Sequence, residues 1–69
     1  MNNITIYNRQ TEDVVEYQSD VPISFAIGEE IRYIDSKNNK VWAYVRKVTK
    51  DLMIEDAHII SVLIKIEVF

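Results

Sequence analysis

Residues 57–69 read AHIISVLIKIEVF, and this stretch decides the fold class. Its even positions from 60 to 68 are all apolar, whereas its odd positions mix apolar, polar and charged side chains. Alternation with a period of two places successive side chains on opposite faces of a strand. The sequence therefore predicts a last strand over 57–69 with a half-exposed odd face. Its even face is expected in the core and consists of Ile60, Val62, Ile64, Ile66 and Val68.

The rest of the chain shares this preference for strand. Val, Ile and Thr supply 22 of the 69 residues, whereas Leu and Ala together supply five. Branching at Cβ costs rotamer freedom in a helix and packs well on a pleated sheet. A helix over 41–60 is the main competing interpretation, because apolar residues there approximate helical spacing. The expected fold is a single all-β domain, residues 1–69, formed by a five-stranded meander or an SH3-like barrel.

A first hairpin is predicted near the start of the chain. It pairs 3–9 with 14–19 across the polar loop 10–13. Pro22 has no N–H to donate and ends this pairing. Gly28 is the only glycine, and it is expected in the turn that opens the next strand.

A second hairpin is predicted between 29–36 and 41–49, with Asn38-Asn39 as a two-residue turn because asparagine tolerates positive φ. With that turn Tyr33 faces Tyr44, and Trp42 shares their face. The opposite face is aliphatic and carries Ile34, Val41, Ala43 and Val45. The aromatic face either lies in the core, since large rings supply much of the core of a small domain, or lies outside as a contact surface.

The layout of this hairpin carries a partial resemblance. The stretch Ile27-Gly28-Glu29-Glu30-Ile31, followed by a strand, a tight turn and Trp42-Ala43-Tyr44-Val45, resembles SH3-like small barrels, in which a glycine and an acidic residue open a strand. It covers about a third of the chain. Because many unrelated functions share this layout, the resemblance implies a fold and no family.

Charge divides the chain into three blocks. Residues 1–30 carry a net charge of −5, residues 31–50 carry +5 and residues 51–69 carry −3. Aromatic side chains are interleaved with the central cations, which is a pattern typical of binding surfaces. The candidate binding residues are Tyr33, Lys37, Lys40, Trp42, Tyr44, Arg46 and Lys47.

The chemical inventory argues against catalysis. One glycine cannot build a glycine-rich phosphate loop, and without cysteine a zinc ion would depend on His58 and carboxylates. His58 is expected to be an ordinary strand residue near a turn. Adjacent carboxylates on a strand point to opposite faces, which does not suit acid–base work. The expectation is therefore a protein that is not an enzyme and has no cofactor and no metal.

The expected function is a non-enzymatic protein-binding module, either a small inhibitor or adaptor or a self-assembling subunit. The expected partner is another protein, with homodimerisation through Ile59, Leu63 and Phe69 on the odd face of the last strand. The alternative expectation is that the last strand is central in a monomer. The N-terminal hairpin then covers its odd face through Ile4, Ile6 or Val15.

A small barrel that binds RNA or single-stranded DNA through the basic aromatic hairpin 31–50 is the alternative function. The isoelectric point near 4.9 counts against it, because non-specific affinity for nucleic acid comes mainly from phosphate contacts. The absence of cysteine, of a cationic leader and of a long apolar stretch suggests a cytoplasmic protein without membrane contact.

Overall fold

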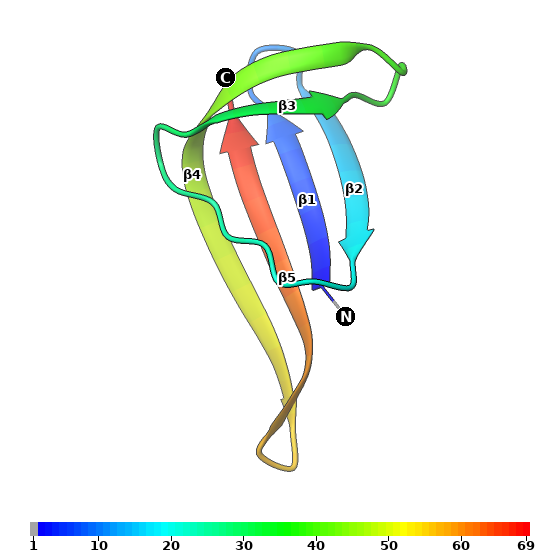
Figure 1. The fold of residues 1–69 in the computed structure, drawn as a ribbon, viewed down its shortest axis with the longest axis vertical. Coiled ribbons are helices and arrows are strands. Elements are labelled where there is room, and N and C mark those ends of the chain that lie inside the picture. Colours follow the sequence, from blue (N-terminus) through cyan, green and yellow to red (C-terminus); the bar gives the residue numbers. More distant parts are fainter. Residues whose placement is uncertain (1) are drawn as a thin grey trace.

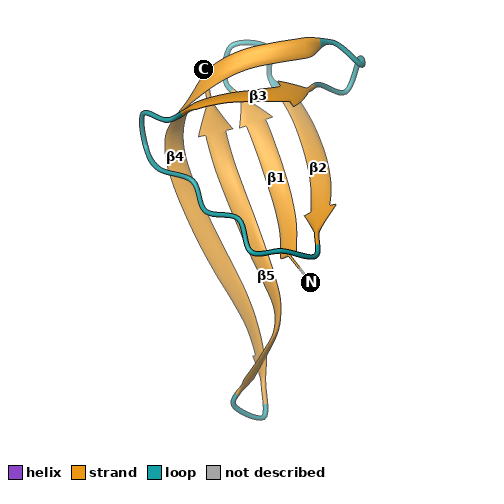
Figure 2. Cartoon of the chain, viewed as in Figure 1, coloured by secondary structure: helices purple, strands orange, loops and turns teal. Residues whose placement is uncertain are grey.

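The computed structural model describes residues 2–69, and these form five strands joined by loops. The strands are β1 (Asn2–Asn8), β2 (Asp13–Ser19), β3 (Glu30–Ile34), β4 (Lys40–Glu55) and β5 (His58–Val68). Figure 2 shows strands and loops throughout this range, so the predicted all-β fold is confirmed and the competing helix over 41–60 is wrong.

The strands make one mixed sheet in the order β2-β1-β5-β4-β3. β1 pairs in parallel with β5, and the other neighbours are antiparallel. Because β2 and β3 are not neighbours, the sheet is not a simple meander. It curls instead into a half-barrel in which β3 crosses above the ends of β1 and β5 (Figure 1).

β4 is the longest strand and belongs to two parts of the molecule. Its first residues pair with β3, and the rest pairs with β5. Arg46 is an extra residue in the ladder between the pairs Val45–Val68 and Lys47–Glu67. A bulge of this kind increases twist and bends a strand. The bend in β4 therefore turns the β3–β4 hairpin across the top of the sheet (Figure 1).

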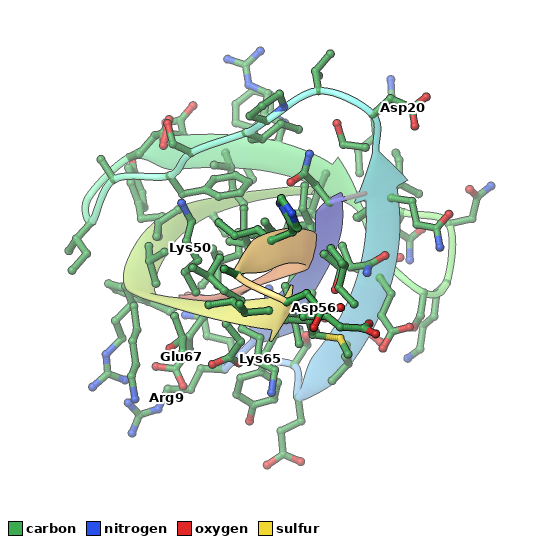
Figure 3. All side chains as sticks on the ribbon, turned by 90° about the horizontal axis from the view of Figure 1, so that it is seen from below. Arg9, Asp20, Lys50, Asp56, Lys65 and Glu67 are labelled. Carbon is green, nitrogen blue, oxygen red and sulfur yellow. The ribbon has the colours of Figure 1, made fainter. Side chains whose placement is uncertain are left out.

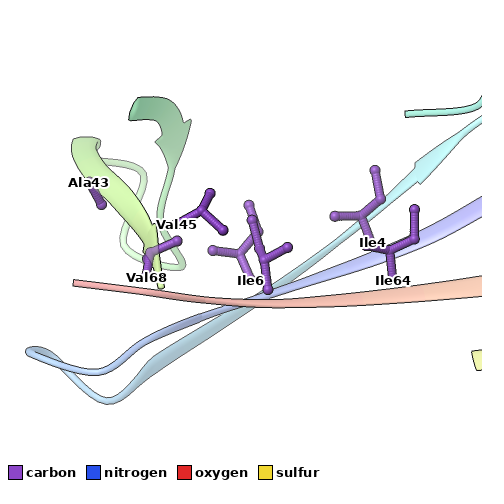
Figure 4. Packing of buried hydrophobic residues seen from close by; sticks show 7 residues of the cluster. Ile4, Ile6, Ala43, Val45, Ile64 and Val68 are labelled. Atoms are coloured by element: carbon purple, nitrogen blue, oxygen red, sulfur yellow. The ribbon is translucent and has the colours of Figure 1, made fainter. Parts of the chain in front are cut away.

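The core lies on one face of the curled sheet. Its buried side chains come from β1, β4 and β5, and Figure 4 shows them gathered on the same side of the ribbon: Ile4, Ile6, Ala43, Val45, Ile64, Ile66 and Val68. The connection 20–29 crosses the open side of the half-barrel (Figure 2), and Ile23 and Phe25 pack against the core from there. Full burial of each Val or Ile side chain contributes about 1.5–3 kcal/mol.

The even face of β5 is only partly as predicted. Ile64, Ile66 and Val68 are buried and Val62 is half-buried, but Ile60 is 49% exposed. Within residues 2–69 the pairing of β1 with β5 begins at Asn2 and Val62, so Ile60 has no described partner in β1 and packs against no core residue. The prediction that Ile60 belongs to the core is wrong for this reason.

The predicted register of the second hairpin is also wrong. Tyr33 pairs with Val41 and Trp42 with Arg32, because the loop has three residues rather than two. The Asp35 carboxylate accepts the N–H groups of Lys37 and Asn39 at 3.0 and 2.7 Å, and Asn38 takes a positive φ of 66°. The shift separates the aromatic residues: Tyr33 lies on the inner face, whereas Trp42 and Tyr44 lie on the outer face.

Side chains join the two edges of the sheet. The Tyr17 hydroxyl of β2 donates to the Ile34 carbonyl at the end of β3. The Asp13 carboxylate accepts the Ser36 hydroxyl and also its N–H, the latter at 3.0 Å. These hydrogen bonds hold the β3–β4 hairpin over the sheet without a backbone ladder between β2 and β3.

Candidate functional site

The predicted binding residues lie at one end of the molecule but do not share one surface. Lys40, Trp42 and Tyr44 lie on the outer face of the β3–β4 hairpin, which is opposite to the core face of Ala43 and Val45. Lys37 lies in the hairpin loop. Two of the predicted residues are arranged differently: Tyr33 points inward and Lys47 faces the outer side of the main sheet. Arg46 sits in the bulge of β4, where its guanidinium contacts Glu67 on the outer side.

Tyr33 is a structural residue. Its ring packs against the core and its hydroxyl accepts a hydrogen bond of 2.9 Å from the Asn8 side-chain amide. Burial raises the pKa of the Tyr33 phenol above its ordinary value, although the bond from Asn8 acts in the opposite direction. A ring in this position is not available for stacking on a ligand.

Trp42 and Tyr44 are exposed aromatic side chains beside cations. The Arg32 guanidinium lies over the Trp42 ring, 4.6 Å from its centre, in a cation–π arrangement. Trp42 is nevertheless 69% exposed. Tyr44 exchanges two backbone hydrogen bonds of 3.2 Å with Phe69, and directly opposed residues share a face of the sheet. Phe69, predicted from the sequence as an interface residue, therefore lies beside Tyr44.

These side chains define the first candidate surface, which we call the aromatic face. It consists of Arg32, Lys40, Trp42, Tyr44, Arg46 and Phe69. Glu30 contacts Arg32 at 3.7 Å in an exposed ion pair, and the half-buried Glu67 contacts Arg46 at 3.6 Å. The aromatic face therefore carries three bases, and the two acids paired with them leave an excess of one positive charge.

The second candidate surface is the end of the β4–β5 hairpin, residues 52–61, which we call the arm. It projects below the rest of the sheet (Figure 1), since within residues 2–69 β1 pairs with Val62–Val68 and β3 with Lys40–Tyr44, and neither reaches the arm. Its turn is Asp56-Ala57, both with positive φ, and Glu55 faces His58 across it. The large apolar side chains of the arm are all exposed: Leu52, Met53, Ile54, Ile59 and Ile60.

Sequence reasoning found only part of the arm. Ile59 was predicted as an interface residue, but the preceding strand was expected to end at Thr49, so Leu52, Met53 and Ile54 were missed. The signal was present, since apolar runs flank the polar pair Glu55-Asp56 on both sides. Such a pattern indicates a hairpin with apolar residues on both faces.

Leu63, the third predicted interface residue, is half-buried in the middle of the sheet. A shallow depression beside it is lined largely by polar residues of β1 and β2, among them Thr5 and Gln18. β5 is a central strand here, as the alternative expectation had it, but the N-terminal hairpin does not cover its odd face. Ile4 and Ile6 lie level with Ile64 and Ile66 on the core side instead.

Several ionisable groups lie outside these two surfaces. Within residues 2–69 no three His, Cys, Asp or Glu side chains are placed to hold a metal ion. Hydrogen bonds from Ser36 lower the pKa of Asp13, which marks a structural contact between the sheet edges. His58 is exposed at the start of β5 beside the turn, as predicted. On the outer side of the sheet Lys65 and Glu67 project away from the core, whereas Lys50 projects from the inner side (Figure 3).

An open groove of about 450 Å³ lies between the inner face and the connection 20–29. Its apolar lining includes Ile4, Ile23, Phe25 and Tyr33, which are residues that also pack on the core. Because the groove is part of the half-barrel interior, it is explained by incomplete closure of the sheet.

Comparisons with protein-family models, with curated proteins and with solved structures found no match. No helix within residues 2–69 is long and apolar enough to cross a membrane.

Proposed function

We propose that this protein is a non-enzymatic protein-binding module that uses the arm as its main contact surface, acting as a self-assembling subunit or as a small inhibitor or adaptor. The observation that carries the proposal is the exposure of the apolar side chains of the arm on both of its faces. Ile54 is 63% exposed and Ile59 is 59% exposed.

The free-energy cost of exposing apolar side chains to water supports this interpretation. Isolated exposed apolar side chains are normal on protein surfaces, but a contiguous apolar patch is typical of an interaction site. A two-stranded hairpin without a covering layer is only marginally stable in water. A protein that docks on the arm removes apolar area from water and also orders the hairpin.

A photo-crosslinking experiment in the cells that make the protein tests the proposal. A photoreactive amino acid replaces Met53 in the arm, and a matched probe replaces Thr49, an exposed residue on the outer face of the same strand. Protein adducts are expected from position 53 and not from position 49. They should disappear when Ile59→Lys is added. Equal labelling at the two positions, or no protein adduct at position 53, contradicts the proposal.

A second candidate function is binding of RNA or single-stranded DNA at the aromatic face. The exposed Trp42 and Tyr44 rings beside Arg32, Lys40 and Arg46 favour it, because bases stack on rings while cations contact phosphates. Titration with mixed oligonucleotides at two salt concentrations tests it. Binding through phosphates has a log–log salt slope of about −0.7 per phosphate neutralised. Absence of binding at low salt removes this candidate.

The cytoplasmic location expected from the sequence stays a prediction. Fractionation of cells that express the protein with a small tag tests it, and recovery in the membrane fraction contradicts it.

A further inference from the structure

The arm and the aromatic face lie at opposite ends of the molecule. The long axis measures 40 Å, with the β3–β4 hairpin at its upper end and the arm at its lower end (Figure 1). Figure 3 looks up this axis from below, with Asp56 in the arm turn. Both ends expose large apolar side chains.

The arm and the aromatic face carry opposite charge. The arm contains the acids Glu55 and Asp56 and no Lys or Arg, and the neighbouring residues Lys50 and Asp51 cancel each other. The aromatic face carries Arg32, Lys40 and Arg46 against Glu30 and Glu67, an excess of one base. Opposite charges across an interface favour encounter and fix the choice of partner.

Charge also disfavours contacts between identical ends. In a two-fold dimer of arms, each negative turn region approaches its own kind, and in a two-fold dimer of aromatic faces the cations Arg32, Lys40 and Arg46 approach theirs. Juxtaposed like charges are unfavourable at an interface. The surface that complements the arm in both hydrophobicity and charge is the aromatic face of another copy.

We propose that the arm of one copy docks on the aromatic face of the next copy, so that the chain assembles head to tail. This inference rests on the proposed function, since it names the partner of the arm. Ile54 and Ile59 contact the rings of Trp42 and Tyr44, and the acids of the arm turn lie near the cations of the face. Phe69 extends the ring surface beside Tyr44.

The geometry of such a contact has a consequence for assembly. A contact between two different surfaces leaves one arm and one face free at the ends of every complex. Further copies add at those ends, and the result is a closed ring if the rotation between copies closes, or an open filament if it does not.

Two variants separate the halves of the interface. The arm variant carries Ile54→Lys and Ile59→Lys, and the face variant carries Trp42→Glu and Tyr44→Glu. All four positions are exposed, so the fold is expected to persist, which circular dichroism and thermal unfolding verify. Thr49→Lys and Thr49→Glu place the same kinds of charge on the exposed outer face of β4 and serve as matched controls.

Sedimentation equilibrium of these proteins tests the inference. The wild type and both Thr49 variants are expected to increase in mass with concentration, and the arm and face variants are each expected to stay monomeric. An equimolar mixture of the arm and face variants should recover a complex of twice the monomer mass and nothing larger. In that complex the intact arm of one variant occupies the intact face of the other.

Each alternative gives a different result. A face variant that dimerises like the wild type indicates contact between arms and overturns the inference, as does a mixture that stays monomeric. A wild type that is monomeric at every concentration also overturns it. If position 53 still crosslinks to a different protein in that case, the proposed function stands and only the choice of partner fails. A monomeric wild type that binds oligonucleotides through Trp42 assigns the face to nucleic acid.

Discussion

The arm and the body of the sheet are built from the same two strands, yet they differ completely in burial. Within the body, β4 and β5 alternate between core and surface because the curled sheet covers one of their faces. In the arm, residues 53–55 of β4 and residues 58–60 of β5 are all exposed. The difference lies in the neighbours, since neither β3 nor the described part of β1 pairs with the arm. Apolar alternation therefore makes a core only where other strands lie beside it.

The comparison also separates two roles within one small chain. The body holds the buried side chains and the hydrogen bonds between the sheet edges, which stabilise the fold. The arm adds little burial of its own, so its apolar residues cost solvation without stabilising the isolated chain. We interpret the body as the folding unit and the arm as the binding element.

The largest expected effect comes from truncating equivalent positions in the two regions. Ile64 is 3% exposed and Ile60 is 49% exposed, although both lie on the even face of β5. Ile64→Ala should reduce the free energy of unfolding by about 2–5 kcal/mol, because it leaves a cavity in the core. Ile60→Ala should change it by less than about 0.5 kcal/mol, as for most surface substitutions. Urea denaturation measures both, and similar losses would show that the arm belongs to the core.

A smaller loss of stability is expected when Asn8, the buried polar side chain of the body, is truncated. Asn8 donates to the Tyr33 hydroxyl, and its side-chain oxygen accepts the N–H groups of Gln10 and Thr11 at 2.9 and 3.2 Å. Asn8→Ala leaves these groups without their partner and should cost about 1–3 kcal/mol. Asn3→Ala, on the outer face of the same strand, is the control. Equal melting temperatures for the two variants would rule out this role for Asn8.

A substitution in the turn of the arm should change the stability of the arm alone. Asp56 and Ala57 have φ values of 51° and 64°, and a left-handed conformation costs a residue with a Cβ about 1–2 kcal/mol. Ala57→Gly relieves this cost, and the greater freedom of glycine in the open hairpin offsets part of the gain. A net gain of about 1 kcal/mol slows hydrogen exchange in residues 52–61 about five-fold. The urea midpoint of the body should not move, and a shift in that midpoint would show that arm and body unfold together.

The smallest effect concerns Asp13, which joins the sheet edges at the surface. Its pKa is lower in the folded chain than the ordinary 3.8, because its carboxylate accepts hydrogen bonds from Ser36. The contribution to stability is therefore present above pH 3.8 and is lost as the pH falls through the folded-state pKa. Ser36→Ala should be slightly less stable than the wild type at neutral pH and indistinguishable from it in acid. A difference that persists in acid would assign the effect to another cause.

Local pattern predicted much of the body. The N-terminal hairpin, the turn at Gly28 and the burial of Ile64, Ile66 and Val68 follow from turn residues and from alternation, which act over a few neighbouring residues. Gly28 takes a positive φ of 90°, and its N–H donates to the Val45 carbonyl at 2.7 Å. The five strands could therefore be located from sequence with errors mainly at their ends.

The errors arise where distant contacts decide the structure. The register of the β3–β4 hairpin depends on the Asp35 side chain, which closes a three-residue loop that the sequence alone did not reveal. The burial of residues on β5 depends on which of them pair with β1, and β1 lies more than fifty residues away in the chain. The aromatic face forms because the bulge at Arg46 turns the hairpin and because Phe69 pairs with Tyr44. These are tertiary features with no local signature.

Sedimentation velocity of a chain without the arm tests the division between body and arm most directly. Replacing Met53–Ser61 with Asn-Gly joins the facing residues Leu52 and Val62 by a two-residue hairpin turn. We predict a compact monomer at all concentrations, under conditions in which the full chain associates. A slowly sedimenting, expanded chain would show that the arm is needed for folding, and association equal to that of the full chain would show that the arm is not the binding element.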